Sequence, residues 1–187
     1  MENPSIEILE DEAYLKVKTI FSKDKKYRYF LKKTWDDKKG NIVFLMLNPS
    51  KADLIKSDNT VTNATNYAVD KDFGSITIVN LFAFMDTDKK SLKDRDKETD
   101  KLNDKYILFA LKECDELVIA WERGTHKKRK REVAKILKKF PEKLRCFVEY
   151  DEQGGYTKVH HLRIFRDIWE YEIWEPEIDL EVELQTK

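Results

Sequence analysis

The sequence predicts an α/β protein with a three-layer α/β/α arrangement around a central four-stranded parallel sheet. Four apolar runs of strand length alternate along the chain with segments of helical periodicity, which is the order typical of this class. The runs lack an alternation of apolar and polar residues, which indicates strands that are buried on both faces. A chain of 187 residues with 41% hydrophobic residues is long enough for one domain of this kind.

The chain begins with two segments that have the character of antiparallel strands, Ile6–Phe21 and Lys26–Trp35. We expect them either to extend the sheet or to cover it. The parallel strands follow, and the first of them stops at an Asn-Pro-Ser turn. The four runs are Ile42–Leu47, Ser75–Val79, Glu116–Trp121 and Leu144–Val148.

Three helices are expected between these strands, each with an apolar face toward the sheet. We also expect the third helix to direct its Lys and Arg side chains outward. The expected bounds are a first helix capped by Ser57 or Asp58, a second that begins at Thr99 or Asp100, and a third over Thr125–Phe140, before Pro141. The inward residues are Val61, Ala64, Tyr67 and Ala68 in the first helix, Leu102, Tyr106, Phe109 and Ala110 in the second, and Val133, Ile136 and Leu137 in the third.

A single domain, residues 1–166, is expected to be followed by an acidic, aromatic tail, residues 167–187. No apolar run approaches the ~18 residues of a membrane span, and the first residues lack the pattern of a secretory leader. We therefore expect a cytoplasmic protein that does not enter a membrane. Cys114 and Cys146 lack the paired spacing of a disulfide scaffold or a zinc ribbon. No metal or cofactor is expected, and the five scattered glycines exclude the phosphate loops of kinases, NTPases and dinucleotide enzymes.

Charge is balanced overall, with 36 basic and 36 acidic residues, but it is unevenly distributed. Residues Arg123–Arg145 hold eleven Lys or Arg against two Glu. Such a cluster in a neutral protein is a candidate surface for DNA, although Lys-rich runs are also common on solvated helix faces. The acidic tail is expected to fold back on a basic patch or to bind a protein partner. The candidate DNA-binding residues are Lys127, Lys128, Arg129, Lys130 and Arg131.

Ligands of open α/β sheets bind outside the carboxyl ends of the strands. The residues at these positions are amides, aromatic rings and imidazoles, which suit a flat polar heterocycle such as a nucleobase better than a phosphate group. His160 and His161 would point to opposite faces of a strand, so at most one of them lines a given pocket. The strand-end residues expected to contact the base are Asn48, Pro49, Ser50, Asn80, Phe82, Trp121 and His160.

Each of these residues also has a purely structural interpretation. Asn48 suits an ordinary Asn-Pro turn, Asn80 can end a strand by bonding to backbone, and Trp121 is typical of a core. Asp53 and Asp58 suit a loop and a helix cap. The joint occurrence of the strand-end residues at four strand ends nevertheless favours a ligand-binding site over these structural interpretations.

Four ordered blocks resemble a bacterial and phage family called domain of unknown function 1643. The blocks are Asn-Pro-Ser-x-Ala-Asp from Asn48, Asn-Leu-Phe-Ala-Phe from Asn80, Ala120-Trp121, and a late His with Leu162. Their order is more distantly similar to that of the uracil-DNA glycosylase superfamily. That resemblance implies that Asn48 positions water, Asn80 reads the base edge and His160 hydrogen-bonds the departing base.

These observations leave three classes of function open. The first is a DNA N-glycosylase-like hydrolase, in which Asn48 or Asp53 holds water and His160 donates to the base. The second is a non-catalytic module that binds nucleic acid or a replication partner. Glu122 and His161 favour it, because they stand where the superfamily has Gly and Pro. The third is an enzyme that acts on a small-molecule nucleotide or nucleobase. This hypothesis is weaker, because the sequence has no phosphate-binding loop.

Overall fold

The computed structural model describes residues 10–50, 55–86, 92, 98–122, 124–150, 153, 156–159 and 170–185. The strands in this part of the chain are β1 (Lys16–Phe21), β2 (Arg28–Thr34), β3 (Asn41–Met46), β4 (Ser75–Asn80), β5 (Glu116–Ala120), β6 (Leu144–Tyr150), β7 (Tyr156–Val159) and β8 (Glu170–Ile173). The helices are α1 (Asn59–Asp70), α2 (Glu98–Lys112), α3 (Lys127–Leu137) and α4 (Ile178–Gln185). A 3₁₀ turn, Pro141–Lys143, precedes β6.

All the described strands belong to one sheet of eight, in the order β1-β2-β4-β3-β5-β6-β7, with β8 also paired to β6. β3 lies between β4 and β5 and pairs in parallel with both, and β5 pairs in parallel with β6. The α/β class is thus confirmed. The expected parallel strands form only the middle of the sheet, because antiparallel strands extend it on both sides to eight strands in the described part of the chain. The N-terminal strands β1 and β2 extend the sheet as an antiparallel pair beside β4.

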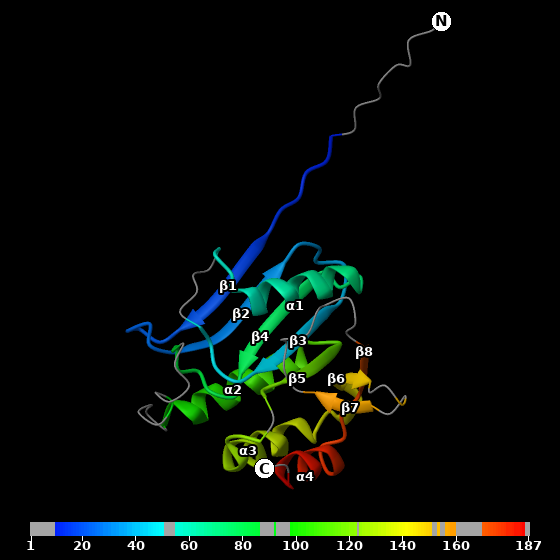
Figure 1. Ribbon diagram of the computed structural model, residues 1–187. Helices are drawn as coiled ribbons and strands as arrows, with labels where there is room; N and C mark the ends of the chain where they lie inside the picture. Colours follow the sequence, from blue (N-terminus) through cyan, green and yellow to red (C-terminus); the bar gives the residue numbers. More distant parts are fainter. Residues whose placement is uncertain are drawn as a thin grey trace, which may run out of the picture.

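Burial on both faces explains why the middle strands are apolar throughout. All six residues of β3 are buried, and successive side chains face opposite sides of the sheet. Phe44 packs into the core under α1, whereas Leu45 packs into the core under α2 and α3. The described sheet is therefore covered by α1 on one face and by α2, α3 and α4 on the other (Figure 1).

The start of α1 is the one that the sequence predicts. Asp58 is its N-cap, and the carboxylate accepts a hydrogen bond of 2.8 Å from the backbone N–H of Val61. This bond satisfies one of the N–H groups that a helix start leaves unpaired. The four inward residues expected for this helix are all buried: Val61, Ala64, Tyr67 and Ala68.

The inward face of α2 differs from the expected one. Leu102 and Phe109 were expected to face inward, but they are 41% and 45% exposed. Asn103 is buried instead, because its side-chain amide donates to the backbone oxygens of Asn80 and Leu81 at 2.9 and 3.3 Å. These two bonds satisfy the amide NH₂ group inside the core, so the helix packs with a polar residue toward the sheet.

α3 also departs from expectation, both in its start and in its orientation. It begins at Lys127 rather than near Thr125, and His126 before it has a positive φ of 54°. The expectation that its Lys and Arg side chains all face outward is wrong for Arg129 and Lys130, which are buried. Both cations find backbone oxygens to bind inside the protein, which offsets the cost of their burial.

The described part of the C-terminal segment belongs to the sheet and the core. β8 pairs antiparallel with β6, and the completely buried Trp174 packs edge-to-face on Trp121 with ring centres 5.6 Å apart. α4 lies beside α3 (Figure 1), where Glu177 forms an ion pair of 3.1 Å with Lys138. Asp179 pairs with a lysine of β7 at 2.8 Å. These acidic residues therefore fold back on basic residues of the same chain.

The two cysteines, Cys114 and Cys146, are buried and free. Burial raises the pKa of the Cys114 thiol to about 12, so this thiol stays protonated and unreactive at neutral pH. Among the helices that the structure describes, none is both long enough and apolar enough to cross a membrane.

Replacing Trp174 by alanine is expected to lower the free energy of unfolding by about 3–5 kcal/mol, because it leaves a cavity beside Trp121. Urea denaturation followed by circular dichroism measures the change. Ile173→Ala is the matched control, since Ile173 is 56% exposed. This control should change stability by less than about 0.5 kcal/mol. A Trp174→Ala variant as stable as the wild type would show that this segment contributes nothing to the core.

Candidate functional site

The candidate site lies at the carboxyl edge of the parallel strands, at the point where the strand order reverses. The chain passes from β3 through α1 to β4 on one face of the sheet, and then through α2 and α3 on the other face to β5 and β6. The described residues after β3, 47–50 and 55–58, and after β5, 121–122 and 124–126, therefore lead to helices on different faces of the sheet. Ligands of open α/β sheets bind between two such segments.

β7 adds a fourth segment to this edge. β8 occupies one side of β6. On the other side, β5 pairs with β6 as far as Cys146, and β7 pairs with the following residues of β6, beginning with Val159 opposite Phe147. β7 therefore lies on the same side of β6 as β5, in line with the end of β5. Val159 is therefore next to the carboxyl end of β5. His160 and His161, which follow it in the sequence, lie outside the described residues.

The Asn-Pro-Ser turn after β3 is held by two hydrogen bonds. The side-chain amide of Asn48 donates to the backbone oxygen of Asp86 at 2.6 Å, which ties this turn to the segment after β4. Ser50 donates to the carboxylate of Asp58 at 2.6 Å, at the start of α1. Pro49 between them is buried. The structure thus brings these three predicted residues to the edge, and it gives Asn48 a role in holding the edge together.

Asn80 and Phe82 lie where β4 ends. Asn80 is buried, and its side-chain Oδ1 has no hydrogen-bond donor among the described residues. Phe82 is almost completely buried, and its ring packs edge-to-face on the imidazole of His126 with centres 4.9 Å apart. Asn80 therefore keeps an unused acceptor at the strand end that was predicted to read a base.

Trp121 and Lys130 support the segment after β5 from inside the protein. Both are completely buried, and the ammonium group of Lys130 lies 5.5 Å from the centre of the Trp121 ring. Lys130 also donates to the backbone oxygen of Glu122, which has a positive φ of 67°. Trp121 thus offers no exposed ring face to a ligand in this conformation. Lys130 is held away from the surface where we expected it to contact DNA.

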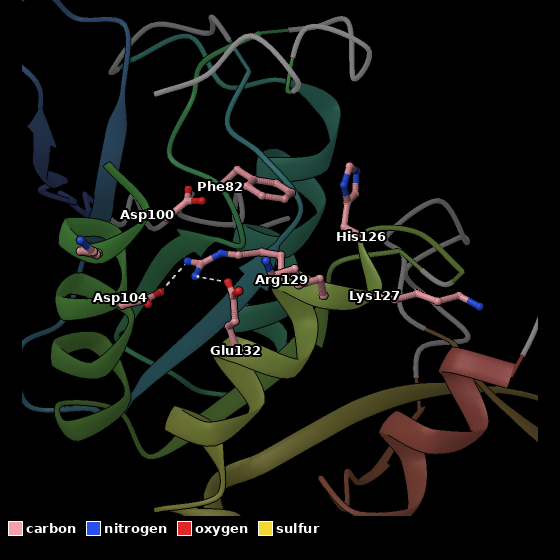
Figure 2. A pocket seen from close by; sticks show the side chains of 9 residues that line it. Phe82, Asp100, Asp104, His126, Lys127, Arg129 and Glu132 are labelled. Carbon is pink, nitrogen blue, oxygen red and sulfur yellow. Dashed lines mark hydrogen bonds and ion pairs between the residues drawn. The ribbon is translucent and has the colours of Figure 1, made fainter. Parts of the chain in front are cut away.

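An open cavity of about 610 Å³ lies beside the start of α3 (Figure 2). Arg129 extends along it from α3 toward α2, and its guanidinium pairs with Asp104 at 2.5 Å and with Glu132 at 3.6 Å. Its Nε also donates to the backbone oxygen of Leu81 at 3.0 Å, so Arg129 joins α2, α3 and the end of β4. We refer to this hollow as the α3 cavity; its lining also includes Phe82, Lys101, His126, Lys127 and Lys128.

Two buried cations lie near the start of α1. Arg28 and Lys33 belong to β2 and are 4% and 6% exposed. Lys33 donates a hydrogen bond to the hydroxyl of Ser57, the residue before the N-cap. Burial lowers the pKa of both cations, and the nearby carboxylate of Asp58 opposes this change. We refer to Arg28, Lys33, Ser50, Ser57 and Asp58 as the cap cluster.

A β-bulge explains why the sequence does not reveal this cluster. The pairing of β1 with β2 shifts by one residue at Tyr29. Side chains alternate along a regular strand, so Arg28 would otherwise face the side opposite Lys33. In the sequence, this part of the chain is a lysine-rich stretch with the composition of solvated surface. No local signal marks the bulge that turns Arg28 inward.

A family model described as protein of unknown function (DUF1643) matches residues 28–160. No curated protein and no solved structure matches the chain. The matched segment contains the cap cluster, the turn after β3 and the α3 cavity. Within the described ranges, no group of three or more His, Cys, Asp or Glu is arranged to hold a metal ion. Asp53, a predicted catalytic residue, lies outside those ranges.

The stability of the protein should depend on the charge of Lys33 at alkaline pH. Burial lowers the pKa of Lys33 below its usual value of 10.5, so the folded state binds this proton less tightly than the unfolded chain does. The contribution of Lys33 to the free energy of unfolding therefore rises as the pH increases toward 10.5. Urea unfolding at a series of pH values measures this rise.

Lys33→Met should lack the alkaline rise, because the side chain no longer titrates. Lys32→Met, on the opposite face of β2, should retain it and serves as the control. The prediction fails if the stabilities of the wild type and of Lys33→Met follow parallel curves over the alkaline range.

Proposed function

The chain belongs to this family of proteins of unknown function, and we propose that it binds DNA at the carboxyl edge of its sheet and reads a base there. One observation carries the proposal: the segments after β3, β4 and β5 and the end of β7 meet where the strand order reverses. Open α/β sheets bind their ligands at this point. Asn48, Ser50 and Asn80 supply amide and hydroxyl groups at the same edge, which suit the polar edge of a base.

The surface beside this edge suits the DNA backbone. Lys101, Lys127 and Lys128 line the α3 cavity and are exposed. Asp104 and Glu132, two of the three carboxylates in this lining, are paired with Arg129, which reduces their repulsion of a phosphate; the third is Asp100. The start of α3 adds the positive end of a helix dipole. Together these groups favour phosphate binding without sequence preference.

The α3 cavity also has room for a nucleotide next to the one that is read. Its volume of about 610 Å³ is within the range of pockets that hold small ligands. His126 and the edge of Phe82 line it, and aromatic side chains of this kind stack with bases of any sequence. Because Phe82 is almost completely buried, His126 supplies most of the accessible ring surface.

A second candidate is a hydrolase that cleaves the N-glycosidic bond of the base, as the similarity to uracil-DNA glycosylases implies. The Oδ1 of Asn80 favours it, because a buried acceptor without a donor in the described part of the chain can accept from the ring N–H of a pyrimidine. Cleavage also requires a held water molecule and a donor to the departing base. In this candidate Asn48 or Asp53 holds the water and His160 donates. Helices on both faces of a parallel sheet are consistent with that superfamily's arrangement.

A protein partner is also part of the proposal, at the acidic C-terminal segment. Glu172, Glu175 and Glu181 are exposed on and beside β8 and α4, which gives this part of the surface a negative charge. A basic partner suits such a surface. We expect the protein to meet its partner and its DNA in the cytoplasm.

Reversing two charges at the start of α3 should weaken DNA binding by ~10-fold or more at low salt, because phosphate contacts and the release of counterions are lost. The variant is Lys127→Glu with Lys128→Glu; Lys130 is left unchanged because it is buried. Fluorescence anisotropy with a labelled oligonucleotide, over a series of salt concentrations, measures the affinity.

Lys135→Glu with Lys139→Glu is the matched control, since it makes the same change of charge toward the other end of the same helix. This control should weaken binding much less. Equal weakening by both pairs would assign the effect to net charge and would contradict a site at the start of α3.

The hydrolase candidate predicts that Asn48→Ala and His160→Ala each slow base release by ~10²-fold or more, because each removes a group that acts in the transition state. Their DNA affinity should stay nearly unchanged. Oligonucleotides that carry uracil or other altered bases, followed by cleavage at abasic sites, provide the assay. His161→Ala is the control and should have a mild effect.

Two outcomes would count against this candidate. A wild-type protein that binds DNA tightly but releases no base from any oligonucleotide is a binding module, not a hydrolase. If His161→Ala abolishes base release and His160→Ala does not, the histidine of the last sequence block is misaligned by one residue.

A further inference from the structure

Within the described part of the chain, the cap cluster carries more positive than negative charge inside the protein. Arg28 and Lys33 are both almost completely buried. Among the described residues, Asp58 is the only carboxylate that interacts electrostatically with either of them. Two cations therefore share one anion. A buried charge without a counterion is unfavourable, and a bound anion relieves it.

The hydrogen bonds of the cluster also leave one buried donor unused. The Nε of Arg28 has no acceptor within the described ranges. Asp58 accepts from Ser50 at 2.6 Å and from the backbone N–H of Val61 at 2.8 Å, and it makes no hydrogen bond with the Nε of Arg28. Lys33 reaches the same place, since it donates to Ser57. The Nε–H of Arg28 is thus a buried donor that a bound anion can satisfy.

The start of α1 adds further donors at the same place. α1 has 12 residues, so its dipole places a partial positive charge at the N-terminal end. The backbone N–H groups of Asn59 and Thr60 precede the group that Asp58 caps, and N–H groups at this position have no partner within the helix. Helix starts of this kind bind phosphate when a cation stands beside them.

We propose that the cap cluster binds a phosphoryl group, either the monoester of a nucleotide or a diester of a DNA backbone. The planar guanidinium of Arg28 matches two phosphate oxygens, and the ammonium group of Lys33 adds a second positive charge. The cluster lies under the α1 face, whereas the α3 cavity opens on the other face of the sheet. This inference does not rest on phosphate binding at the α3 cavity, although Ser50 belongs both to the cap cluster and to the edge that we propose reads a base.

Inorganic phosphate tests the site without any nucleic acid. Isothermal titration calorimetry, against sodium chloride of matched ionic strength, should show saturable binding by the wild-type protein. Arg28→Gln and Lys33→Gln should each raise the Kd by ~10-fold or more, because each removes a charged donor. Lys32→Gln is the matched control on the opposite face of β2 and should leave the Kd unchanged. Lys135→Glu with Lys139→Glu, which reverses two exposed charges outside the cap cluster and outside the lining of the α3 cavity, should also leave it unchanged.

Two further arms identify the source of the phosphoryl group. Thymidine 5′-monophosphate presents a monoester, and a hexathymidylate without terminal phosphates presents only diesters. The ligand whose affinity falls more in Arg28→Gln and Lys33→Gln is the one that the cluster holds. Should Arg28→Gln fail to fold, as judged by circular dichroism, the comparison of Lys33→Gln with Lys32→Gln replaces it. Phosphate should then also slow hydrogen exchange of the wild-type amides of residues 57–61.

The proposal is overturned if the wild type binds none of the three ligands. It is equally overturned if Lys33→Gln and Lys32→Gln bind phosphate as tightly as the wild type does.

Discussion

Burial of the parallel strands on both faces is the constraint on which the rest of the structure depends. β3 and β4 have no side that water reaches, so helices have to cover the sheet above and below. The chain meets this requirement by taking α1 to one face and α2 and α3 to the other. The segments on either side of β3 consequently diverge at the carboxyl edge. The position of the candidate site thus follows from the way in which the core is closed.

Buried polar side chains of the helices then fix this edge. Asn103 and Arg129 both donate to the backbone oxygen of Leu81, just past β4, and Lys130 donates to that of Glu122, just past β5. A strand end leaves backbone oxygens that no neighbouring strand can pair, and these oxygens need partners when they are buried. The helices supply them. Three polar groups that look misplaced in a core therefore hold the loops on which a ligand would sit.

Periodicity predicts the middle strands and α1, because in these elements the apolar residues are the ones that are buried. The same reasoning fails where burial depends on a specific bond. Asn103 and Arg129 face inward because distant backbone oxygens accept from them, and no local pattern shows this. The strand-end residues Asn48 and Ser50 are predictable, since parallel strands share one carboxyl edge. The cap cluster is not, because a one-residue bulge at Tyr29 and contacts between β2 and the start of α1 create it.

The packing of Trp121 on Trp174 has a consequence for the order in which the chain folds. Trp174 follows α3, β6, β7 and β8 in the sequence, so its contact with Trp121 closes a long loop and is expected to form late. During synthesis the N-terminal strands emerge first. β6 can pair with β5 before β8, its neighbour on the other side, has emerged. The segment after β5 rests on Trp121, so we expect it to gain its full support only when β8 and Trp174 have joined the core.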